Sequence, residues 1–453
     1  MKHTGRHQSL AGRKILFANA PADGHFNPLT GLAMYLKELG CDVRWYSAHE
    51  YAERINRLQI HHYPYKKARE ITGTNLGTML PGRDKIKNPI KKLNLDMKEF
   101  FILRSVEYYE DILDINENFD FDLMISDNCF SAIPFVRDKM KKEVIAIGVL
   151  PLTETSRDLP PSGLGLTPSY SLLGKLKQSV LRYLAANVLF KASNKMMQNL
   201  LASHGIHHNN LSVFDILVHK STLLLQSGTP GIEYRRSDMS KNVRFIGALL
   251  PYSSKKQQLP WFDERLKQYS RIAVLTQGTV EKDVTKLLVP ALEAFKNTDT
   301  LVICTTGGSQ TAGLKQAYPQ SNLIIEDFIP FADIMPYAHV YITNGGYGGV
   351  MLGIQNKLPL VVAGVHEGKN EICARVGYFK LGVNLKTETP SPVQIRQAVD
   401  QVLENTLYRK NVEALAREFA MFRPQELVAG YVAETIQPTH KVTYDHLLSM
   451  ASA

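Results

Sequence analysis

The sequence predicts an α/β protein with two halves, each built around its own parallel sheet. The first half opens with an apolar strand, a helix and a second strand, at Lys14–Asn19, Pro28–Leu39 and Asp42–Tyr46. A strand–helix–strand unit of this length joins parallel strands. The same order starts again at Arg271–Thr276, and a length of 453 residues suits two domains better than one core.

The other elements of the first half continue this alternation of strands and helices. Ala20–Asn27 is a turn-rich stretch between the first strand and the first helix, and Gly40 ends that helix. Leu123–Ser126 and Val144–Val149 are apolar runs short enough to be buried strands. They extend the first parallel sheet.

A long loop and a basic helix complete this half. Pro151–Thr167 is rich in Pro and Gly and predicts a loop. Tyr170–Leu201 has amphipathic helical spacing and carries Lys175, Lys177, Arg182 and Lys191. We favour a helix that packs on its own domain over one that lies on a membrane surface.

The second half contains a further series of strands and helices. The strand Arg271–Thr276 is followed by a turn at Gln277–Thr279 and a helix at Leu287–Phe295. Further strands are predicted at Thr300–Thr305, Leu323–Ile325, Val340–Thr343 and Leu358–Ala363. The Pro-, Gly- and Ser-rich stretch Ser227–Trp261 holds the boundary, so we expect domains at 1–235 and 236–425. Residues 426–453 form a C-terminal helical segment that can cross back to the first domain.

Composition excludes several classes of protein. Hydrophobic residues are 44% and charged residues 21%, which is typical of a soluble globular protein. No apolar run reaches 18 residues, and Met1–Arg13 lacks the apolar stretch of a secretory signal. The four cysteines form no CxxC pair, so we expect neither a zinc site nor a disulfide framework, and we expect a cytoplasmic location.

The net charge of +10 favours phosphate-bearing partners or an anionic surface. The densest basic stretch, Lys85–Lys92, has no interleaved aromatic residues, so we do not predict nucleic-acid binding. No GxSxG and no GxGxxG after the first strand are present, which argues against an α/β-hydrolase and a nicotinamide dehydrogenase.

A glycine-rich turn indicates an anion site in the second half. Thr343–Val350 reads TNGGYGGV and joins a buried strand to an apolar helical stretch. Glycines let a ligand approach the backbone, and the helix N-terminus offers free N–H groups and a partial positive charge. Gln277–Thr279 lies at the carboxyl end of another strand, the edge at which open α/β sheets bind ligands. Together the two loops predict a nucleotide diphosphate ligand.

In the first half, His25 and Asp127 are candidate catalytic residues. His25 follows the first strand, and Asp127 follows the strand Leu123–Ser126. A carboxylate bonded to one imidazole nitrogen fixes the tautomer and raises the basicity of the other nitrogen. This pairing would make His25 a general base.

These features together resemble the nucleotide-sugar-dependent glycosyltransferases of the GT-B fold, which include plant flavonoid and bacterial macrolide glycosyltransferases. The resemblance implies two Rossmann-like, doubly wound parallel-sheet domains that face each other across a cleft. The first would bind the acceptor and the second the nucleotide sugar. The segments that carry the resemblance are Gly24–Pro28, Asp127, Pro160–Gly163, Val243–Pro251 and the continuous block Asp327–Leu385.

The resemblance implies a mechanism. In the family, the histidine matching His25 deprotonates the acceptor hydroxyl. The aspartate matching Asp127 orients that histidine and stabilises its positive charge. The oxygen attacks the anomeric carbon and the nucleotide diphosphate leaves with inversion. No metal or other cofactor is implied, because helix-end amides and hydroxyls take the phosphate charge.

The resemblance also implies a donor site. The diphosphate would lie against the glycine-rich turn, the base would stack on an aromatic ring, and a backbone group would read the base edge. The residues at those positions are Gly345, Gly346, Gly348, Gly349 and Thr279 for the diphosphate, Phe328 for stacking and Ile329 for the base edge.

This chain departs from the family at several donor positions. Asn344 stands where the family usually has His, Gly349 where it has Ser or Thr, and Leu352 where a Glu binds the ribose. The Asp-Gln pair that binds sugar hydroxyls falls on Gly368-Lys369, flanked by Glu367 and Glu371. We count Asn344, Glu367 and Lys369 among the candidate donor-binding residues.

Leu352 suggests the donor. An apolar side chain beside a ribose 2′-hydroxyl leaves that group without a partner, whereas a deoxyribose has no such group. We therefore favour a dTDP-sugar, with dTDP-rhamnose first and dTDP- or UDP-glucose as alternatives, and a flavonoid or other phenol as acceptor. Two other hypotheses stay open: a membrane-surface transferase with a lipid acceptor, which the basic helix and pI of 9.2 support, and a non-catalytic activator protein.

Overall fold

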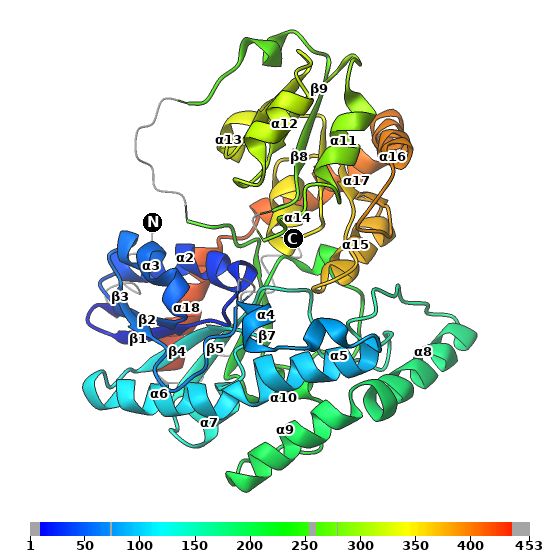
Figure 1. The fold of residues 1–453 in the computed structure, drawn as a ribbon. Helices are drawn as coiled ribbons and strands as arrows, with labels where there is room; N and C mark the ends of the chain where they lie inside the picture. Colours follow the sequence, from blue (N-terminus) through cyan, green and yellow to red (C-terminus); the bar gives the residue numbers. More distant parts are fainter. Residues whose placement is uncertain (1–9, 73–74, 253–259, 279, 437–453) are drawn as a thin grey trace.

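The computed structural model describes residues 10–72, 75–252, 260–278 and 280–436, which form two α/β domains (Figure 1). Each domain has one sheet in which every pair of neighbouring strands is parallel. The predicted fold class is confirmed. Among the described residues, no helix has the length and apolar character needed to cross a membrane.

The first sheet has the order β3-β2-β1-β4-β5-β6-β7. The order reverses between β1 and β4, and the carboxyl ends of these two strands lie side by side. The strands are β1 (Lys14–Ala18), β2 (Asp42–Ser47), β3 (His61–Pro64), β4 (Leu123–Asp127), β5 (Glu143–Gly148), β6 (Leu223–Ser227) and β7 (Val243–Gly247).

The second sheet has the order β10-β9-β8-β11-β12-β13 and reverses between β8 and β11. Open α/β sheets bind ligands at such reversals, because the connecting loops diverge there and leave room. The strands are β8 (Arg271–Thr276), β9 (Thr300–Thr305), β10 (Leu323–Glu326), β11 (Val340–Thr343), β12 (Leu360–Val362) and β13 (Gly382–Asn384).

Helices cover both faces of each sheet. The inner strands are buried on both sides, which explains why they read as continuous apolar runs. The helices of the first domain are α2 (Asp23–Glu38), α3 (Ala52–Arg57), α4 (Leu76–Met79), α5 (Pro89–Asp96), α6 (Arg104–Asn118), α7 (Ile133–Asp138), α8 (Leu172–Leu184), α9 (Lys191–Ser203) and α10 (Val213–Lys220). Those that follow are α11 (Leu288–Phe295), α12 (Thr311–Ala317), α13 (Phe331–Ile334), α14 (Tyr347–Gln355), α15 (Lys369–Tyr378), α16 (Pro392–Glu404), α17 (Thr406–Ala420) and α18 (Pro424–Ile436).

Two expectations about local structure are wrong. The stretch Ala20–Asn27 is not all turn, because α2 begins at Asp23 and carries Pro28 inside it. Pro28 has no N–H to donate to the carbonyl of Gly24 one turn earlier, so α2 lacks one intrahelical hydrogen bond near its N-terminus. The predicted helix Tyr170–Leu201 is two helices, α8 and α9, joined by a π-helical turn at Ala185–Leu189.

The predicted boundary at residue 235 is also wrong. Strand β7 lies beyond it but pairs in parallel with β6, so the first sheet extends to Gly247. The Pro- and Ser-rich stretch around residues 228–242 is a connection within the first domain, and sequence composition alone does not distinguish it from an interdomain linker.

The last described helix returns to the first domain. Helix α18 packs against α2 and β7, and Val428, Ala429 and Val432 are buried in the same core as Trp45. The chain therefore crosses between the domains twice, once after β7 and once before α18 (Figure 1).

We expect Val432→Ala to lower the stability of the first domain. The side chain is fully buried, so its loss leaves a cavity that costs about 1–3 kcal/mol. The chain has two tryptophans, so in a Trp261→Phe background Trp45 fluorescence reports first-domain unfolding in urea. The control is Met421→Ala, whose side chain is 71% exposed. An unchanged Trp45 transition in Val432→Ala would contradict the packing of α18.

Candidate active site

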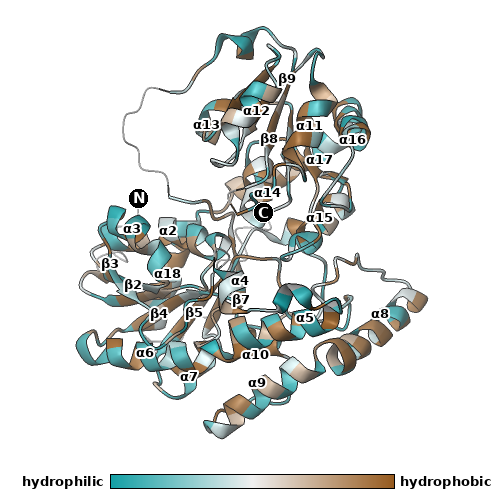
Figure 2. Ribbon diagram, viewed as in Figure 1, coloured by the Kyte–Doolittle hydropathy of each residue, from teal (hydrophilic) through white to brown (hydrophobic). Residues whose placement is uncertain are grey.

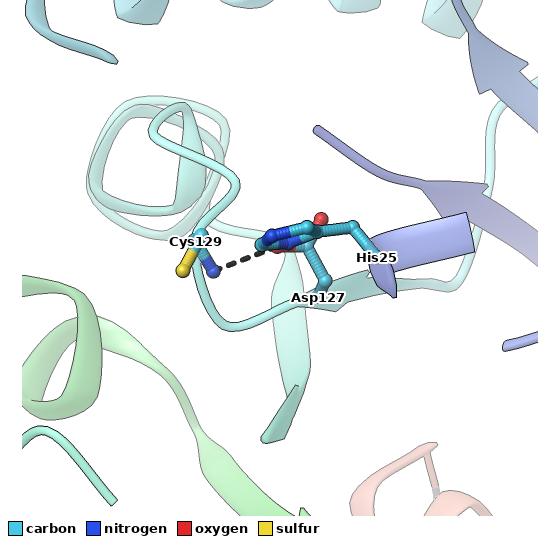
Figure 3. Close-up of side chains that lie close together, drawn as sticks. All are labelled: His25, Asp127 and Cys129. Carbon is cyan, nitrogen blue, oxygen red and sulfur yellow. Dashed lines mark hydrogen bonds and ion pairs between the residues drawn. The ribbon is translucent and has the colours of Figure 1, made fainter. Parts of the chain in front are cut away.

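The predicted catalytic pair is assembled at the reversal of the first sheet. Asp127 is the last residue of β4, and His25 lies in the first turn of α2, just after β1. Their side chains meet with 2.7 Å between His25 Nδ1 and Asp127 Oδ1 (Figure 3). Asp127 is fully buried, whereas 17% of the His25 side chain is exposed.

The hydrogen bonds around Asp127 define the protonation pattern. Its Oδ2 accepts from the backbone N–H of Ala20 at 2.7 Å, and its Oδ1 also accepts from that of Cys129 at 2.8 Å. These donors stabilise a buried carboxylate, which in turn holds the proton of His25 on Nδ1. Nε2 is left as a lone-pair acceptor, with no hydrogen bond to any described residue. This is the arrangement of a histidine general base.

Cys129 completes a cluster whose side-chain atoms lie within 4.8 Å of one another (Figure 3). Burial, assisted by the neighbouring charge of Asp127, raises the pKa of the Cys129 thiol well above its ordinary value. A neutral thiol is a poor metal ligand, because the thiolate is the form that binds. Within this cluster His25 and Asp127 are joined by a direct hydrogen bond.

The glycine-rich turn connects β11 to α14 at the reversal of the second sheet. Gly345 has φ +78°, and a Cβ there would lie 2.3 Å from Cys373 Sγ, so only glycine fits. Gly346 caps α14 without any side-chain hydrogen bond, and a Cβ on Gly348 would meet no atom within 4 Å. The first amides of α14 therefore have no side-chain cap and lie at the positive end of the helix dipole, as an anion site requires. Gly349 lies in the same turn.

Asn344 joins the two loops that flank this reversal. Its Nδ2 donates to the backbone carbonyl of Gln277, and its Oδ1 accepts from the N–H of Gly346 at 3.3 Å. The family's usual imidazole is therefore replaced by an amide that ties the end of β8 to the start of α14. Gln277 Oε1 is buried beside it and has no hydrogen-bond partner among the described residues.

A pocket at the carboxyl ends of β8, β11 and β12 contains charged residues that the sequence reasoning missed. Lys286 Nζ lies 2.6 Å from Glu281 Oε2 and 3.5 Å from Glu388 Oε2. Burial disfavours the charged form of Glu281, but hydrogen bonds from Lys286 and the Asp283 N–H, together with the charges of Lys286 and Lys369, outweigh it and lower the pKa of that carboxyl. The lining residues are Gln277, Glu281, Lys286, Leu287, Asn344, Ala363, Lys369 and Glu388.

The other predicted donor residues are placed as follows. Lys369 lines the pocket and pairs with Glu367 at 2.5 Å. Phe328 follows β10 and is 70% exposed, whereas Ile329 is buried in the second-domain core. Thr279 lies outside the described residues.

Glu371 holds a loop of the first domain. Its Oε1 accepts from the backbone N–H of Gly163 at 2.9 Å and of Gly165 at 2.8 Å. Its Oε2 pairs with Arg375 at 3.0 Å, and Arg375 pairs in turn with Glu233 at 2.8 Å. These contacts link Glu371 of the second domain to the Gly163–Gly165 loop of the first domain. No short-range sequence signal reveals this link, because Gly163 and Gly165 lie more than 200 residues away from Glu371.

The two half-sites come together at the contact between α2 and α14. Tyr347, the first residue of α14, donates from its hydroxyl to the backbone carbonyl of Ser227 at 2.7 Å. The helix that carries His25 thus abuts the helix that carries the glycine-rich turn, and Figure 1 shows α14 at the junction of the domains.

Comparison with known proteins identifies the family. The chain is 32% identical to 4′-demethylrebeccamycin synthase of Lentzea aerocolonigenes over 410 residues, which covers 90% of this chain and 96% of that protein. The chain belongs to the UDP/dTDP-glycosyltransferase superfamily. It is also 30% identical to UDP-glucosyltransferase 1 of Beauveria bassiana, covering 89% of this chain and 91% of that protein. Residues 290–433 of this superfamily member match the family described as erythromycin biosynthesis protein CIII-like, C-terminal domain.

Solved glycosyltransferases share the fold. The glycotransferase of kitacinnamycin aligns with a TM-score of 0.72 at 17% identity over 94% of this chain and 100% of that chain. The calicheamicin glycosyltransferase CalG4 aligns with a TM-score of 0.71 at 18% identity over 94% and 98%. VinC in complex with dTDP aligns with a TM-score of 0.63 at 14% identity over 94% and 100%. The chain is therefore a GT-B glycosyltransferase, a transferase enzyme, and the non-catalytic activator hypothesis is not adopted.

We expect His25→Ala to reduce kcat by about 10²–10⁴-fold, because a positioned general base contributes about that much. The measurement is nucleotide diphosphate release in the presence of acceptor. His207→Ala, at an exposed position, is the control and should keep full activity. Full activity in His25→Ala would remove this residue from the mechanism.

We expect Glu371→Ala to lower the free energy of unfolding by about 3–5 kcal/mol, because Arg375 keeps a buried charge that has lost one of its two carboxylate partners. Release of the Gly163 and Gly165 amides should also speed chymotrypsin cleavage at Leu164 or Leu166. Glu367→Ala, whose side chain is 63% exposed, is the control on the same segment. Equal cleavage rates in the two variants would show that Glu371 does not hold the loop.

Proposed function

We propose that the enzyme is an inverting, metal-independent O-glycosyltransferase that acts on a hydroxyl of a small apolar acceptor. Nε2 of His25 takes the hydroxyl proton while the acceptor oxygen forms a bond to the anomeric carbon. The bond from that carbon to the diphosphate oxygen breaks, and the nucleotide diphosphate leaves. Attack from the face opposite the leaving group inverts the anomeric centre.

The single observation that carries this proposal is the His25–Asp127 hydrogen bond with Nε2 left free. The buried Asp127 carboxylate stabilises the imidazolium that forms when the proton is taken. On the donor side, the uncapped amides of α14 supply preorganised dipoles for the charge that develops on the leaving diphosphate. These two parts supply the base and the leaving-group stabilisation without a metal ion.

The surroundings of Leu352 support a dTDP-sugar donor. Leu352 lies one helical turn after Gly348 on α14, and both lie on the side of the helix that is not fully buried. A ligand bound at the N-terminus of α14 would place its pentose near this side chain. A ribose 2′-hydroxyl would lose a hydrogen bond there, at a cost of about 1–3 kcal/mol, which is a preference of roughly 5- to 150-fold.

For the transferred sugar we propose rhamnose, with glucose as the alternative, and for the acceptor a flavonoid or other phenol. A lipid acceptor is the second candidate, and it would use the same dyad.

The test is a donor panel with purified enzyme and a phenolic acceptor, read as nucleotide diphosphate release. We expect dTDP-rhamnose or dTDP-glucose to be turned over faster than UDP-glucose, with the opposite anomeric configuration in the product. Equal or better turnover with UDP-glucose would overturn the dTDP assignment. Retention of configuration would overturn the inverting mechanism.

A matched variant tests the role of Leu352 directly. Leu352→Glu restores a carboxylate that can accept a bond from a ribose hydroxyl, so it should raise the ratio of UDP- to dTDP-sugar turnover. Leu407→Glu, at a partly exposed leucine of α17, is the control for the added charge. An unchanged ratio in Leu352→Glu would show that this side chain does not face the pentose.

A further inference from the structure

Helix α8 presents a strongly apolar face to solvent. Leu172 is 88% exposed and Leu173 is 81% exposed, and the least exposed member of the face is Leu184 at 46%. Figure 2 shows this helix as a brown segment that extends from the body of the first domain. The face, here called the α8 face, consists of Leu172, Leu173, Leu176, Val180, Tyr183 and Leu184.

The side of α8 that faces the protein is largely polar or small. Gln178 is buried, and its amide donates to the carbonyl of Asp158 at 3.0 Å and accepts from the N–H of Ser169 at 2.6 Å. Arg182 donates to the carbonyl of Leu159. A helix of a soluble domain normally buries its apolar side. In α8 the orientation is reversed, with polar groups attached to the protein and large apolar groups left outside.

The charge around the α8 face has one sign. Residues 159–214 contain no Asp or Glu but include Lys175, Lys177, Arg182, Lys191 and Lys195. At 100° per residue, Lys175 and Lys177 lie at opposite edges of the apolar face, and both are exposed. An apolar stripe bordered by lysines matches the interface of a bilayer, with acyl chains under the stripe and anionic headgroups under the ammonium groups.

We propose that the α8 face docks the enzyme on the surface of an anionic lipid bilayer. The helix would lie in the plane of the interface, with its apolar side chains among the lipids and its lysines at the headgroups. Since no helix of the described residues could cross a membrane, the attachment is peripheral. This inference goes beyond the proposed glycosyl transfer and does not depend on the identity of donor or acceptor.

A second copy of the chain fits the α8 face poorly. With 13 residues, α8 is about 20 Å long and presents a single stripe, whereas a stable interface buries about 800 Å² per partner. A twofold pairing of α8 would also bring the lysines of one copy beside those of the other. No carboxylate between residues 159 and 214 could compensate them.

Two further exposed leucines lie in the loop that precedes α8. Leu164 and Leu166 are 40% and 36% exposed, and they alternate with Gly163 and Gly165, the residues held by Glu371. A bilayer under α8 would lie near the first-domain loop that Glu371 holds, and an apolar acceptor dissolved in the membrane would be concentrated close to the enzyme.

The test is co-sedimentation of the full chain with phosphatidylcholine vesicles, with and without phosphatidylserine. We expect binding to the phosphatidylserine vesicles that weakens as salt is added. The triple variant Leu172→Ser, Leu176→Ser, Val180→Ser should bind at least tenfold more weakly. Lys175→Gln with Lys177→Gln should lose about fivefold per lysine on anionic vesicles only, because each lysine near such a surface contributes about that factor.

The control is a triple serine variant at exposed apolar positions elsewhere, Val393→Ser, Leu407→Ser and Met421→Ser, which should bind vesicles as the parent does. All variants should keep the parent melting temperature and should turn over a water-soluble acceptor at the parent rate. Absence of turnover in the parent would contradict the proposed function and would leave the vesicle-binding result unaffected. Absence of binding by the parent, or equal binding by the α8 triple variant, overturns the proposal. A concentration-dependent dimer that the α8 substitutions abolish, without vesicle binding, would assign the face to a second copy.

Discussion

The arrangement of the two domains depends on one buried guanidinium. Arg375 is 3% exposed, and an unpaired charge at that depth would be strongly destabilising. Its carboxylate partners come from both sides of the junction: Glu233 from the connection within the first domain, and Glu371 from its own helix, which also holds Gly163 and Gly165. The pairing is satisfied only when α15 lies against the first domain.

That constraint orients two sheets that would otherwise be independent. Each sheet reverses its strand order next to its first strand, and the functional loops of each emerge at that point. The dyad of His25 and Asp127 belongs to one reversal, and the turn around Gly345 belongs to the other. Parallel strand order gathers the loops of each sheet at one edge. The contact between the domains then brings the two groups of loops together.

The sequence predicted the features whose signals lie within a short stretch of the chain. The apolar strands, the glycine-rich turn and the histidine near a buried carboxylate were all predictable, since period, glycine content and strand ends are local properties. The position of β7, the reversed orientation of α8 and the role of Glu371 were not. Each depends on which segment the element packs against, and periodicity does not report that. A glutamate that holds a loop looks the same in sequence as one that binds a sugar.

The return of α18 to the first domain affects how this protein can be made and recombined. Val428 and Val432 belong to a core whose other members were synthesised hundreds of residues earlier. During translation, the first-domain residues that pack against α18 stay exposed until the second domain and α18 have been synthesised. A chimera that exchanges halves with a relative should therefore carry residues 424–436 together with the amino-terminal half, so that each lobe keeps its native lining.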